Sequence, residues 1–360
     1  MIETRSESLL LRPCDVSPSR SDLEVVGVFN PAVAIGNNGL TMLARVAERP
    51  LESRADWTPL PRWSSSGAIE VDWVRNQDLT LIDARVVAIK DSGDLRLTSV
   101  SHLQVLRSSN ITGESWDFVR TILPEGPWEE YGIEDPRITK IDDTYWVTYV
   151  AVSRSGAATA LMSSTDMVNF QRHGIIFPSE NKDVVLFPEM FSDGYAALHR
   201  PNPHSRFKAP QIWLARSLDM IHWGRHQLVL SGMHPWEGDR VGSGTPPILC
   251  DEGWLTLYHG STRPNSTGTV GCYSAGALLL DRDQPGRVLA RSSQPIMQPS
   301  TDYELHGFVP NVVFPTAMLD RDEELHVFYG AADTYIAAAR FLKQSVLDSL
   351  QLKDSCKPRQ

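Results

Sequence analysis

The sequence predicts an all-β fold, a five-bladed β-propeller with a C-terminal helix packed outside it. Short strands rich in β-branched, aromatic and aliphatic residues follow polar turns about every 50 residues. Two pairs of similar segments share nearly the same spacing, and helical patterns of 10 to 15 residues do not separate the strands. Several short strands per repeat are typical of propeller blades, whereas βαβ units alternate each strand with a helix.

The repeat rests on two pairs of segments. Residues 83–101 resemble residues 135–153 at an offset of 52, with Asp, Arg and Ser at matching positions. Residues 161–170 resemble residues 214–223 at an offset of 53. Because two separate pairs agree on the spacing, we interpret it as the length of one blade.

Polar turns locate the strands within this period. Turns such as Ser192-Asp193-Gly194 and Asp251-Glu252-Gly253 precede apolar runs, which is a hairpin signal. Candidate strands lie near residues 41, 95, 145, 195, 254 and 325. A circular propeller usually joins N- and C-terminal strands in one blade, so these six candidates are compatible with five blades.

The predicted catalytic domain spans residues 1–335. Within it, residues 48–77 are rich in Pro, Arg, Trp and Ser and are expected to form an irregular loop over one face. Residues 336–360 are expected to form a helix and tail, because Leu342, Val346 and Leu350 recur every four residues.

Composition excludes several functions. The 360 residues carry a formal charge of −10, which disfavours nucleic acid and anionic membranes as partners. No run of 18 apolar residues, the length expected of a membrane-spanning helix, is present. The cysteines have neither CxxC spacing nor histidines at ligand spacing, so we expect no metal site, reduced thiols and a cytoplasmic location. They are Cys14, Cys250, Cys272 and Cys356.

Charged and polar residues recur where the predicted strands end, and inner strands of a propeller direct such ends at one central pocket. Arg, Lys and His together bind phosphate or a carboxylate well. No phosphate-binding glycine loop is present, so a nucleotide is not implied. The alternative is that these residues form turns and salt bridges between blades. The strand-end residues are Arg45, Asp135, Arg137, Lys182, Asp183, His199, Arg200, Tyr258, His259 and Asp333.

An ordered series of motifs resembles glycoside hydrolase family 130, the family of mannoside phosphorylases and β-1,2-mannosidases. The resemblance extends from Phe29-Asn30-Pro31 to Asp333, roughly 85% of the chain. A single block would be weak evidence, but a whole series in order is specific. The blocks are Gly132-Ile-Glu-Asp-Pro-Arg137, Asn181-Lys-Asp-Val-Val-Leu-Phe-Pro-Glu189, Leu198-His-Arg-Pro201, Gly244-Thr-Pro-Pro247, Leu257-Tyr-His-Gly260 and Tyr329-Gly-Ala-Ala-Asp333.

The resemblance implies a five-bladed propeller and inverting cleavage of a β-mannosidic bond. It implies Asp135 as the proton donor, acting through a sugar hydroxyl, and inorganic phosphate as co-substrate, with no metal or organic cofactor. The phosphate ligands it implies are Lys182, Arg200, His259 and Tyr273. The substrate-binding residues expected on the same basis are Asn30, Arg45, Asp83, Arg137, Asp183, Tyr258, Glu304 and Asp333.

Phosphorolysis is favoured because hydrolytic relatives lack the basic set, which is intact here. The expected substrate is β-1,2-linked mannobiose or oligomannan, and the product is α-mannose 1-phosphate. The alternatives are an inverting β-1,2-mannosidase, a phosphorylase of β-1,4-mannosyl-glucose or mannosyl-N-acetylglucosamine, and a glycan-binding propeller without turnover. The expected partners are a small oligosaccharide and phosphate, and a homo-oligomer is compatible with the sequence.

Overall fold

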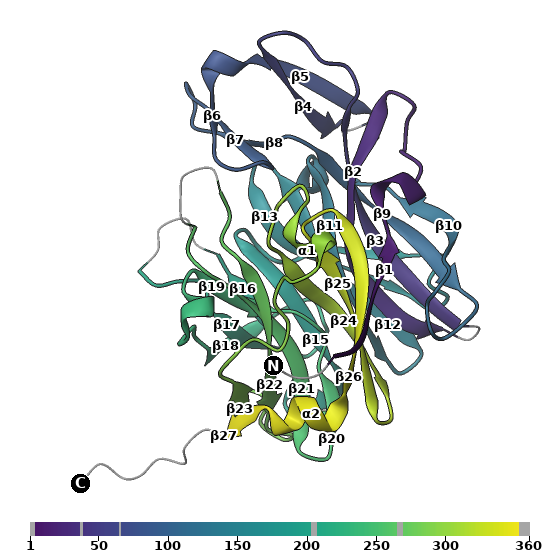
Figure 1. The fold of residues 1–360 in the computed structure, drawn as a ribbon, viewed down its shortest axis with the longest axis vertical. Helices are drawn as coiled ribbons and strands as arrows, with labels where there is room; N and C mark the ends of the chain where they lie inside the picture. Colours follow the sequence, from purple (N-terminus) through teal and green to yellow (C-terminus); the bar gives the residue numbers. More distant parts are fainter. Residues whose placement is uncertain (1–3, 37–38, 65, 203–206, 265–268, 353–360) are drawn as a thin grey trace.

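The computed structural model describes residues 4–36, 39–64, 66–202, 207–264 and 269–352, and these are almost entirely β-strands (Figure 1). The predicted all-β class is confirmed. The described helical elements are all short: η1 (Pro13–Asp15), η2 (Asn76–Asp78), η3 (Pro127–Glu129), η4 (Pro235–Glu237), α1 (Asp302–Leu305) and α2 (Lys343–Asp348).

The strands form antiparallel groups that follow one another along the chain. Group 1 contains β2 (Leu23–Gly36), β3 (Gly39–Pro50), β9 (Val100–Ser108) and β10 (Asp117–Ile122). Group 2 contains β11 (Gly132–Ile141), β12 (Thr144–Ser153), β13 (Gly156–Ser164) and β14 (Gln171–Phe177). Group 3 contains β15 (Asn181–Phe191), β16 (Gly194–Pro201), β17 (Ile212–Ser217) and β18 (Gly224–Leu230).

Group 4 contains β19 (Arg240–Ser243), β20 (Ile248–Cys250), β21 (Gly253–Ser261), β22 (Tyr273–Leu280), β23 (Val288–Ser292) and β27 (Leu350–Leu352). Group 5 contains β24 (Val313–Arg321), β25 (Glu324–Ala331), β26 (Tyr335–Leu342) and β1 (Thr4–Leu11). Because β1 pairs with β26, the N-terminal strand completes the C-terminal group. The expected joining of the chain's two ends in one group is confirmed.

The predicted turns are tight hairpins. Ile141 pairs with Thr144 and Cys250 pairs with Gly253, so two residues connect the strands in each case. Five of the six predicted strand centres lie on the second or central strand of a group, in β3, β12, β16, β21 and β25. The predicted turn at Asn37 and Asn38 lies outside the described residues.

A strand also lies near residue 95, as predicted, but it does not belong to any of the five groups. Residue 95 begins β8 (Leu95–Leu97), in a segment inserted between β3 and β9. Residues 83–101 therefore differ in structure from residues 135–153, which belong to β11 and β12. The second repeat is confirmed, because residues 161–170 and 214–223 cover corresponding strands, β13 and β17, and the turns that follow them.

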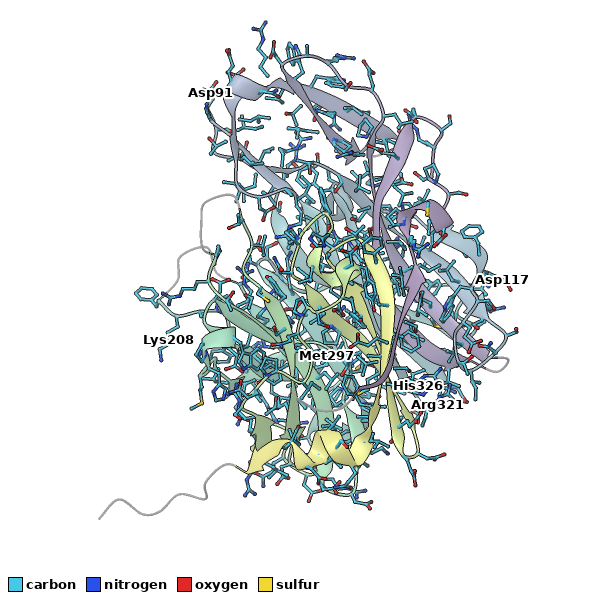
Figure 2. The ribbon with its side chains drawn as sticks, in the orientation of Figure 1. Asp91, Asp117, Lys208, Met297, Arg321 and His326 are labelled. Atoms are coloured by element: carbon cyan, nitrogen blue, oxygen red, sulfur yellow. The ribbon has the colours of Figure 1, made fainter. Side chains whose placement is uncertain are left out.

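The predicted irregular loop at 48–77 is also wrong. This stretch contains the paired strands β4 (Trp57–Trp63) and β5 (Ile69–Arg75), and the inserted segment continues through β6 (Leu79–Leu81) and β7 (Val86–Ile89) to β8. Pro59 and Pro61 obscure the strand pattern, but proline is tolerated in a strand at a sheet edge. The segment lies at the top of Figure 1, and Figure 2 marks its outer end with Asp91.

The predicted helix at residues 336–352 is wrong as well. Residues 335–342 form β26, which pairs with both β25 and β1, and only α2 is helical. The four-residue spacing of Leu342, Val346 and Leu350 arises from three successive elements. Pairing on both edges overrides the weak local helical pattern. The boundary predicted at residue 335 thus falls inside a strand.

Five clusters of buried apolar side chains lie between consecutive groups, and one of them joins group 5 to group 1. Burial of apolar surface stabilises a fold by about 25 cal/mol per Å², so these clusters hold neighbouring groups together. Members from neighbouring groups include Leu43 with Tyr149, Leu161 with Leu186, Phe187 with Trp254, Leu257 with Tyr329, and Phe328 with Leu40. Among the described residues, no helix has the length and apolar character needed to cross a membrane.

Candidate active site

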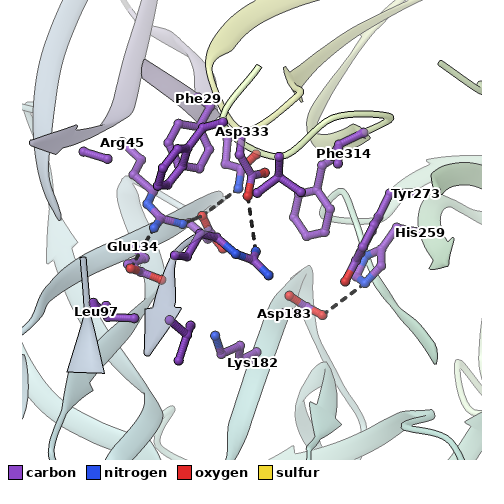
Figure 3. Close-up of a pocket in the computed structure, with 18 of the residues that line it drawn as sticks. Phe29, Arg45, Leu97, Glu134, Lys182, Asp183, His259, Tyr273, Phe314 and Asp333 are labelled. Carbon is purple, nitrogen blue, oxygen red and sulfur yellow. Dashed lines mark hydrogen bonds and ion pairs between the residues drawn. The ribbon is translucent and has the colours of Figure 1, made fainter. Parts of the chain in front are cut away.

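A pocket of about 180 Å³ lies where the groups meet (Figure 3). The first and second strands of several groups line it, together with four residues from the inserted segment, Arg85, Val86, Leu97 and Ser99. Nine of the thirteen residues predicted from the sequence come together here: Asn30, Arg45, Asp135, Lys182, Asp183, Arg200, His259, Tyr273 and Asp333.

Three of these residues occupy an unusual backbone conformation on the first strands. Asn30, Asp135 and Asp183 have φ angles of 48°, 49° and 57°. At each of them the pairing with the second strand shifts register, which marks a β-bulge. Positive φ is costly for most residues but is better tolerated by Asn and Asp, and bulges re-aim side chains near active sites. The bulges explain how three strands each present a polar side chain to one pocket.

Asp135 accepts hydrogen bonds from Asn30 Nδ2 at 2.8 Å and from Arg45 Nη1 at 2.9 Å. Arg45 Nη2 also contacts Glu134 Oε1 at 2.7 Å. Burial alone would raise the pKa of Asp135, but Arg45, Arg137, Asn30 and Lys182 together lower it to about 2. Asp135 is therefore a carboxylate at neutral pH when the pocket holds no anion.

Basic side chains gather at the other end of the pocket. Arg200 Nε donates a hydrogen bond to Asp183 Oδ2 at 2.6 Å, and His259 Nε2 lies 3.5 Å from the same oxygen. The ring of Phe314 packs against His259 with centroids 4.5 Å apart. Gly242 permits this arrangement, because a Cβ there would collide with Asp183 and His259. The backbone of β19 thus lies close to both the imidazole and the carboxylate, and Figure 3 shows these two side chains facing each other.

Several buried side-chain nitrogens in this cluster have no hydrogen-bond partner among the described residues. They include Arg200 Nη1, which is a donor, and both ring nitrogens of His259, of which one donates and the other accepts when the ring is neutral. Leaving a buried donor unsatisfied costs about 1–3 kcal/mol, so such groups are rare unless a ligand completes them. Burial lowers the pKa of His259 to about 3, with Arg200 and Arg137 acting in the same direction and Asp183 opposing them. The imidazole is thus neutral in the empty pocket, and the site fits a small anion that brings acceptor oxygens.

Four predicted substrate-binding residues do not line this pocket. Arg137 is buried behind it and donates to the backbone oxygens of Gly244 and Asp135, at 2.6 and 2.9 Å. Asp83 lies outside the pocket and holds Arg85. Tyr258 and Glu304 point into the protein, where each makes a buried hydrogen bond described below.

Comparison with known proteins agrees with the motif series. The family model described as beta-1,4-mannooligosaccharide phosphorylase, glycoside hydrolase family 130, matches residues 96–352. A β-1,2-mannobiose phosphorylase from Listeria innocua is 37% identical over 96% of this chain and 98% of its own. The chain belongs to glycoside hydrolase family 130.

Further similarities are consistent with membership of family 130. A 1,2-β-oligomannan phosphorylase from a Thermoanaerobacter species is 37% identical over 64% of this chain and 76% of its own. The solved structure of the Listeria innocua phosphorylase in complex with β-1,2-mannobiose has a TM-score of 0.88. It covers 94% of this chain and 96% of that one at 36% identity.

Some residues that line the family 130 pocket were not among those predicted from the sequence. Glu134 stands beside Asp135 in the Gly132–Arg137 motif, and its pairing with Arg45 places it in the pocket. Arg240 begins β19 and carries no motif signal. Arg85 comes from the inserted segment and reaches Asp333 Oδ2 at 3.2 Å across 248 residues of sequence, a contact that no local pattern predicts.

A buried Glu–Tyr pair recurs in three groups and explains Tyr258 and Glu304. The tyrosine hydroxyl donates to the glutamate at 2.7 to 2.8 Å in each, and the glutamate also accepts a backbone N–H of its own turn. In groups 2 and 4 an arginine contacts both partners. The pairs are Glu129–Tyr149 with Arg172, Glu237–Tyr258 with Arg291, and Glu304–Tyr329.

The pair in group 4 adjoins the cation cluster. Tyr258 and His259 are neighbours on β21, and alternate residues of a strand face opposite sides. Tyr258 is therefore anchored to η4 on one side while His259 faces the pocket on the other. No described residue of β12, which carries Tyr149, lines the pocket.

We expect Tyr258→Phe to weaken phosphate binding, because it frees β21 beside His259. Tyr149→Phe is the matched control, since it removes the same hydrogen bond from an otherwise similar triad. Both variants should lose about 1–3 kcal/mol of unfolding free energy. Only Tyr258→Phe should raise the KM for phosphate, roughly threefold or more, as measured by initial rates at saturating mannoside. Equal phosphate KM values in the two variants would contradict this role.

Acid should destabilise the protein through three buried histidines. Burial lowers the pKa of His102 to about 4 and those of His199 and His259 to about 3, so all are neutral when folded. In the unfolded chain they bind protons below about pH 6.5. The unfolding free energy should therefore fall with decreasing pH below 6.5, by about 1.4 kcal/mol per pH unit for each histidine.

Urea unfolding between pH 7.5 and 5 measures this dependence. His259→Gln should show a shallower dependence, by about one proton, than the unmodified protein. Identical slopes for the two proteins would show that His259 does not stay neutral in the folded state.

Proposed function

We propose that this protein is an inverting β-mannoside phosphorylase that acts on β-1,2-linked mannobiose or oligomannan and releases α-mannose 1-phosphate. The observation that carries the proposal is that one pocket holds a carboxylate and, separately, basic side chains with unpartnered nitrogens. A largely buried carboxylate, Asp135, lines the same pocket as Arg200 and His259, and among the described residues Arg200 Nη1 and the His259 ring nitrogens have no hydrogen-bond partner. Such donors suit the oxygens of inorganic phosphate, which is the only co-substrate proposed.

The β-1,2 linkage is supported by the relatives. The Listeria innocua protein, named a β-1,2-mannobiose phosphorylase, is similar over nearly the whole of both chains, and its structure was solved with β-1,2-mannobiose. The family model carries a β-1,4 description but matches only residues 96–352. The inserted segment, most of which lies before residue 96, contributes Arg85 to the pocket. A relative that is similar over this segment as well, as the Listeria innocua protein is, is therefore the better guide to the linkage of the substrate.

In the proposed reaction a phosphate oxygen attacks the anomeric carbon as the glycosidic carbon–oxygen bond breaks. The electron pair of that bond goes to the leaving oxygen, which takes a proton supplied by Asp135 through a sugar hydroxyl. Lys182, Arg200 and His259 hold the phosphate, and positioning it makes the step nearly unimolecular. Asp135 then recovers a proton from phosphate or solvent.

Phosphate binding also prepares the proton donor. A pKa of about 2 leaves Asp135 ionised in the empty pocket, and Arg45 and Lys182 contribute to that value. A phosphate dianion offsets these cations. Its negative charge repels the ionised form of the carboxyl, and this repulsion is strong in a partly buried site of low effective dielectric constant. Bound phosphate thus raises the pKa of Asp135 toward the range of a useful acid.

Hydrolysis is the less favoured reaction. An inverting glycosidase needs a second carboxylate that is free to activate water. In this pocket Glu134 pairs with Arg45, Asp183 with Arg200, and Asp333 with Arg85. Carboxylates engaged by guanidinium groups are less available to activate water, although burial raises the pKa of Asp333 above its usual value. A pocket that only binds glycan would not explain unpartnered donors suited to phosphate.

The finer fold proposed is a five-bladed β-propeller, with each strand group as one blade. Among the first strands of groups 1 to 4, β2 contacts β11, β11 contacts β15, and β15 contacts β19. In group 5, β24 contacts both β22 and β2. The five apolar clusters between groups support the same closed order. The catalytic pocket then occupies the central channel.

A cytoplasmic location and the absence of a metal remain proposals. In the described part of the chain Cys14, Cys250 and Cys272 are free thiols, as expected in a reducing compartment. No group of three or more His, Cys, Asp or Glu side chains there is arranged to hold a metal ion.

Incubation with β-1,2-mannobiose, with and without phosphate, tests the function. We expect mannose 1-phosphate and mannose only when phosphate is present, as detected by ion chromatography. Free mannose alone in phosphate-free buffer would establish a hydrolase instead. Binding of mannobiose without any product, across β-1,2 and β-1,4 mannosides, would favour the glycan-binding alternative.

Asp135→Asn should abolish proton donation while preserving the pocket. General acid catalysis is worth roughly 10²–10⁴-fold, so kcat should fall by that factor. Asp72→Asn is the matched control, because Asp72 is also an aspartate paired with arginine, here Arg62 and Arg96, but it does not line the pocket. The control should retain activity, and circular dichroism should show both variants folded. Full activity in Asp135→Asn would overturn the donor assignment.

A further inference from the structure

The catalytic pocket is too small for a long oligosaccharide. Its volume is about 180 Å³, whereas pockets that enclose a drug-sized ligand measure roughly 300–1,000 Å³. A second cavity of about 400 Å³ adjoins it and shares two wall residues, Phe308 and Val309. We call this second cavity the outer groove. Its other described lining residues include Asp83, Ala84, Thr262, Val270 and Asn311.

The two cavities lie on opposite sides of a thin wall. Tyr273 and Val312 form a β-bridge and face the pocket, while their chain neighbours Cys272 and Asn311 face the groove. The backbone N–H of Tyr273 donates to the Asn311 oxygen at 3.0 Å, which fixes the wall. Because Phe308 and Val309 line both cavities, a ligand that extends past these two residues from the pocket would reach the groove.

The inserted segment forms the far side of the groove through Asp83 and Ala84. Asp83 Oδ2 contacts Arg85 Nη2 at 2.9 Å, and Arg85 reaches Asp333 in the pocket at 3.2 Å. One arginine thus ties a residue of the groove to a residue of the pocket.

The lining of the groove suits a neutral sugar. Val270 and Phe308 offer apolar surface, while Thr262 and Asn311 offer polar atoms beside it. The charged side chains that line the groove, Asp83 and Arg263, are opposite in sign; Asp83 pairs with Arg85, and Arg263 Nε donates to the backbone oxygen of Gly238 at 3.3 Å. Ligand sites typically combine apolar walls with a few polar groups in this way.

We propose that the outer groove binds the leaving-group portion of a longer β-1,2-mannan, beyond the sugars at the cleaved bond. This inference rests on the proposed phosphorylase function and adds chain-length preference to it. One relative is named a mannobiose phosphorylase and another an oligomannan phosphorylase, both at 37% identity, so similarity alone does not decide between them. The groove assigns this protein to the class that uses oligomannan.

Ala84→Trp tests the proposal by filling the groove. Ala84 is exposed and its side chain has no role in the pocket, so the variant should fold and keep its activity on mannobiose. Ala55→Trp is the matched control, because Ala55 is an exposed alanine of the same inserted segment that does not line the groove. The probes are β-1,2-mannobiose and β-1,2-mannotriose at saturating phosphate.

The unmodified protein should use mannotriose at least as well as mannobiose, measured as kcat/KM. Each sugar hydrogen bond lost is worth roughly two- to tenfold in kcat/KM, so Ala84→Trp should lower the triose-to-biose ratio by about fivefold. Ala55→Trp should leave that ratio unchanged. An unchanged ratio in Ala84→Trp, or poor use of mannotriose by the unmodified protein, overturns the groove. Absence of phosphorolysis with both sugars would instead refute the proposed function.

Discussion

The pairing of buried charges is the constraint on which the pocket depends. A carboxylate or guanidinium taken out of water is costly unless a partner of opposite charge accompanies it, and breaking a buried pair costs about 3–5 kcal/mol. Arg45 with Asp135 and Arg200 with Asp183 meet this requirement before any ligand arrives. What remains is a small surplus of donors on Arg200 and His259. A site built on pairs can therefore stay folded and still attract one small anion.

The fold delivers these pairs by two local devices. Bulges at Asn30, Asp135 and Asp183 turn side chains of first strands out of the ladder and into the pocket. On the second strands, successive side chains point to opposite faces of the sheet. Arg200 and His259 therefore face the pocket, while His199 and Tyr258 pack behind it. The packing behind is also specific, because the Glu–Tyr pairs tie second strands to the short helical turns before first strands. Chemistry and architecture thus occupy opposite faces of the same strands.

This division explains what the sequence could and could not predict. Tight turns such as 142–143 and 251–252 depend on local residues, and they located the second strands correctly. Motifs identified most of the pocket, but the sequence alone did not say which of Tyr258 and His259 faces it. The inserted hairpin was obscured by prolines, and β26 forms only because β25 and β1 flank it. The contact of Arg85 with Asp333 joins segments that lie 248 residues apart, so no local pattern could predict it.

The same electrostatics gives a reason for phosphorolysis over hydrolysis in the proposed mechanism. Arg45, Arg137, Asn30 and Lys182 hold the pKa of Asp135 near 2, so the carboxyl cannot act as an acid in the empty pocket. Water brings no negative charge and leaves that pKa unchanged, whereas a phosphate dianion opposes the cations and raises it. The proton needed by the leaving oxygen is then available only when the phosphate nucleophile is present. Nucleophile binding and acid activation become one event, even though the protein as a whole carries a charge of −10 that repels anions at long range.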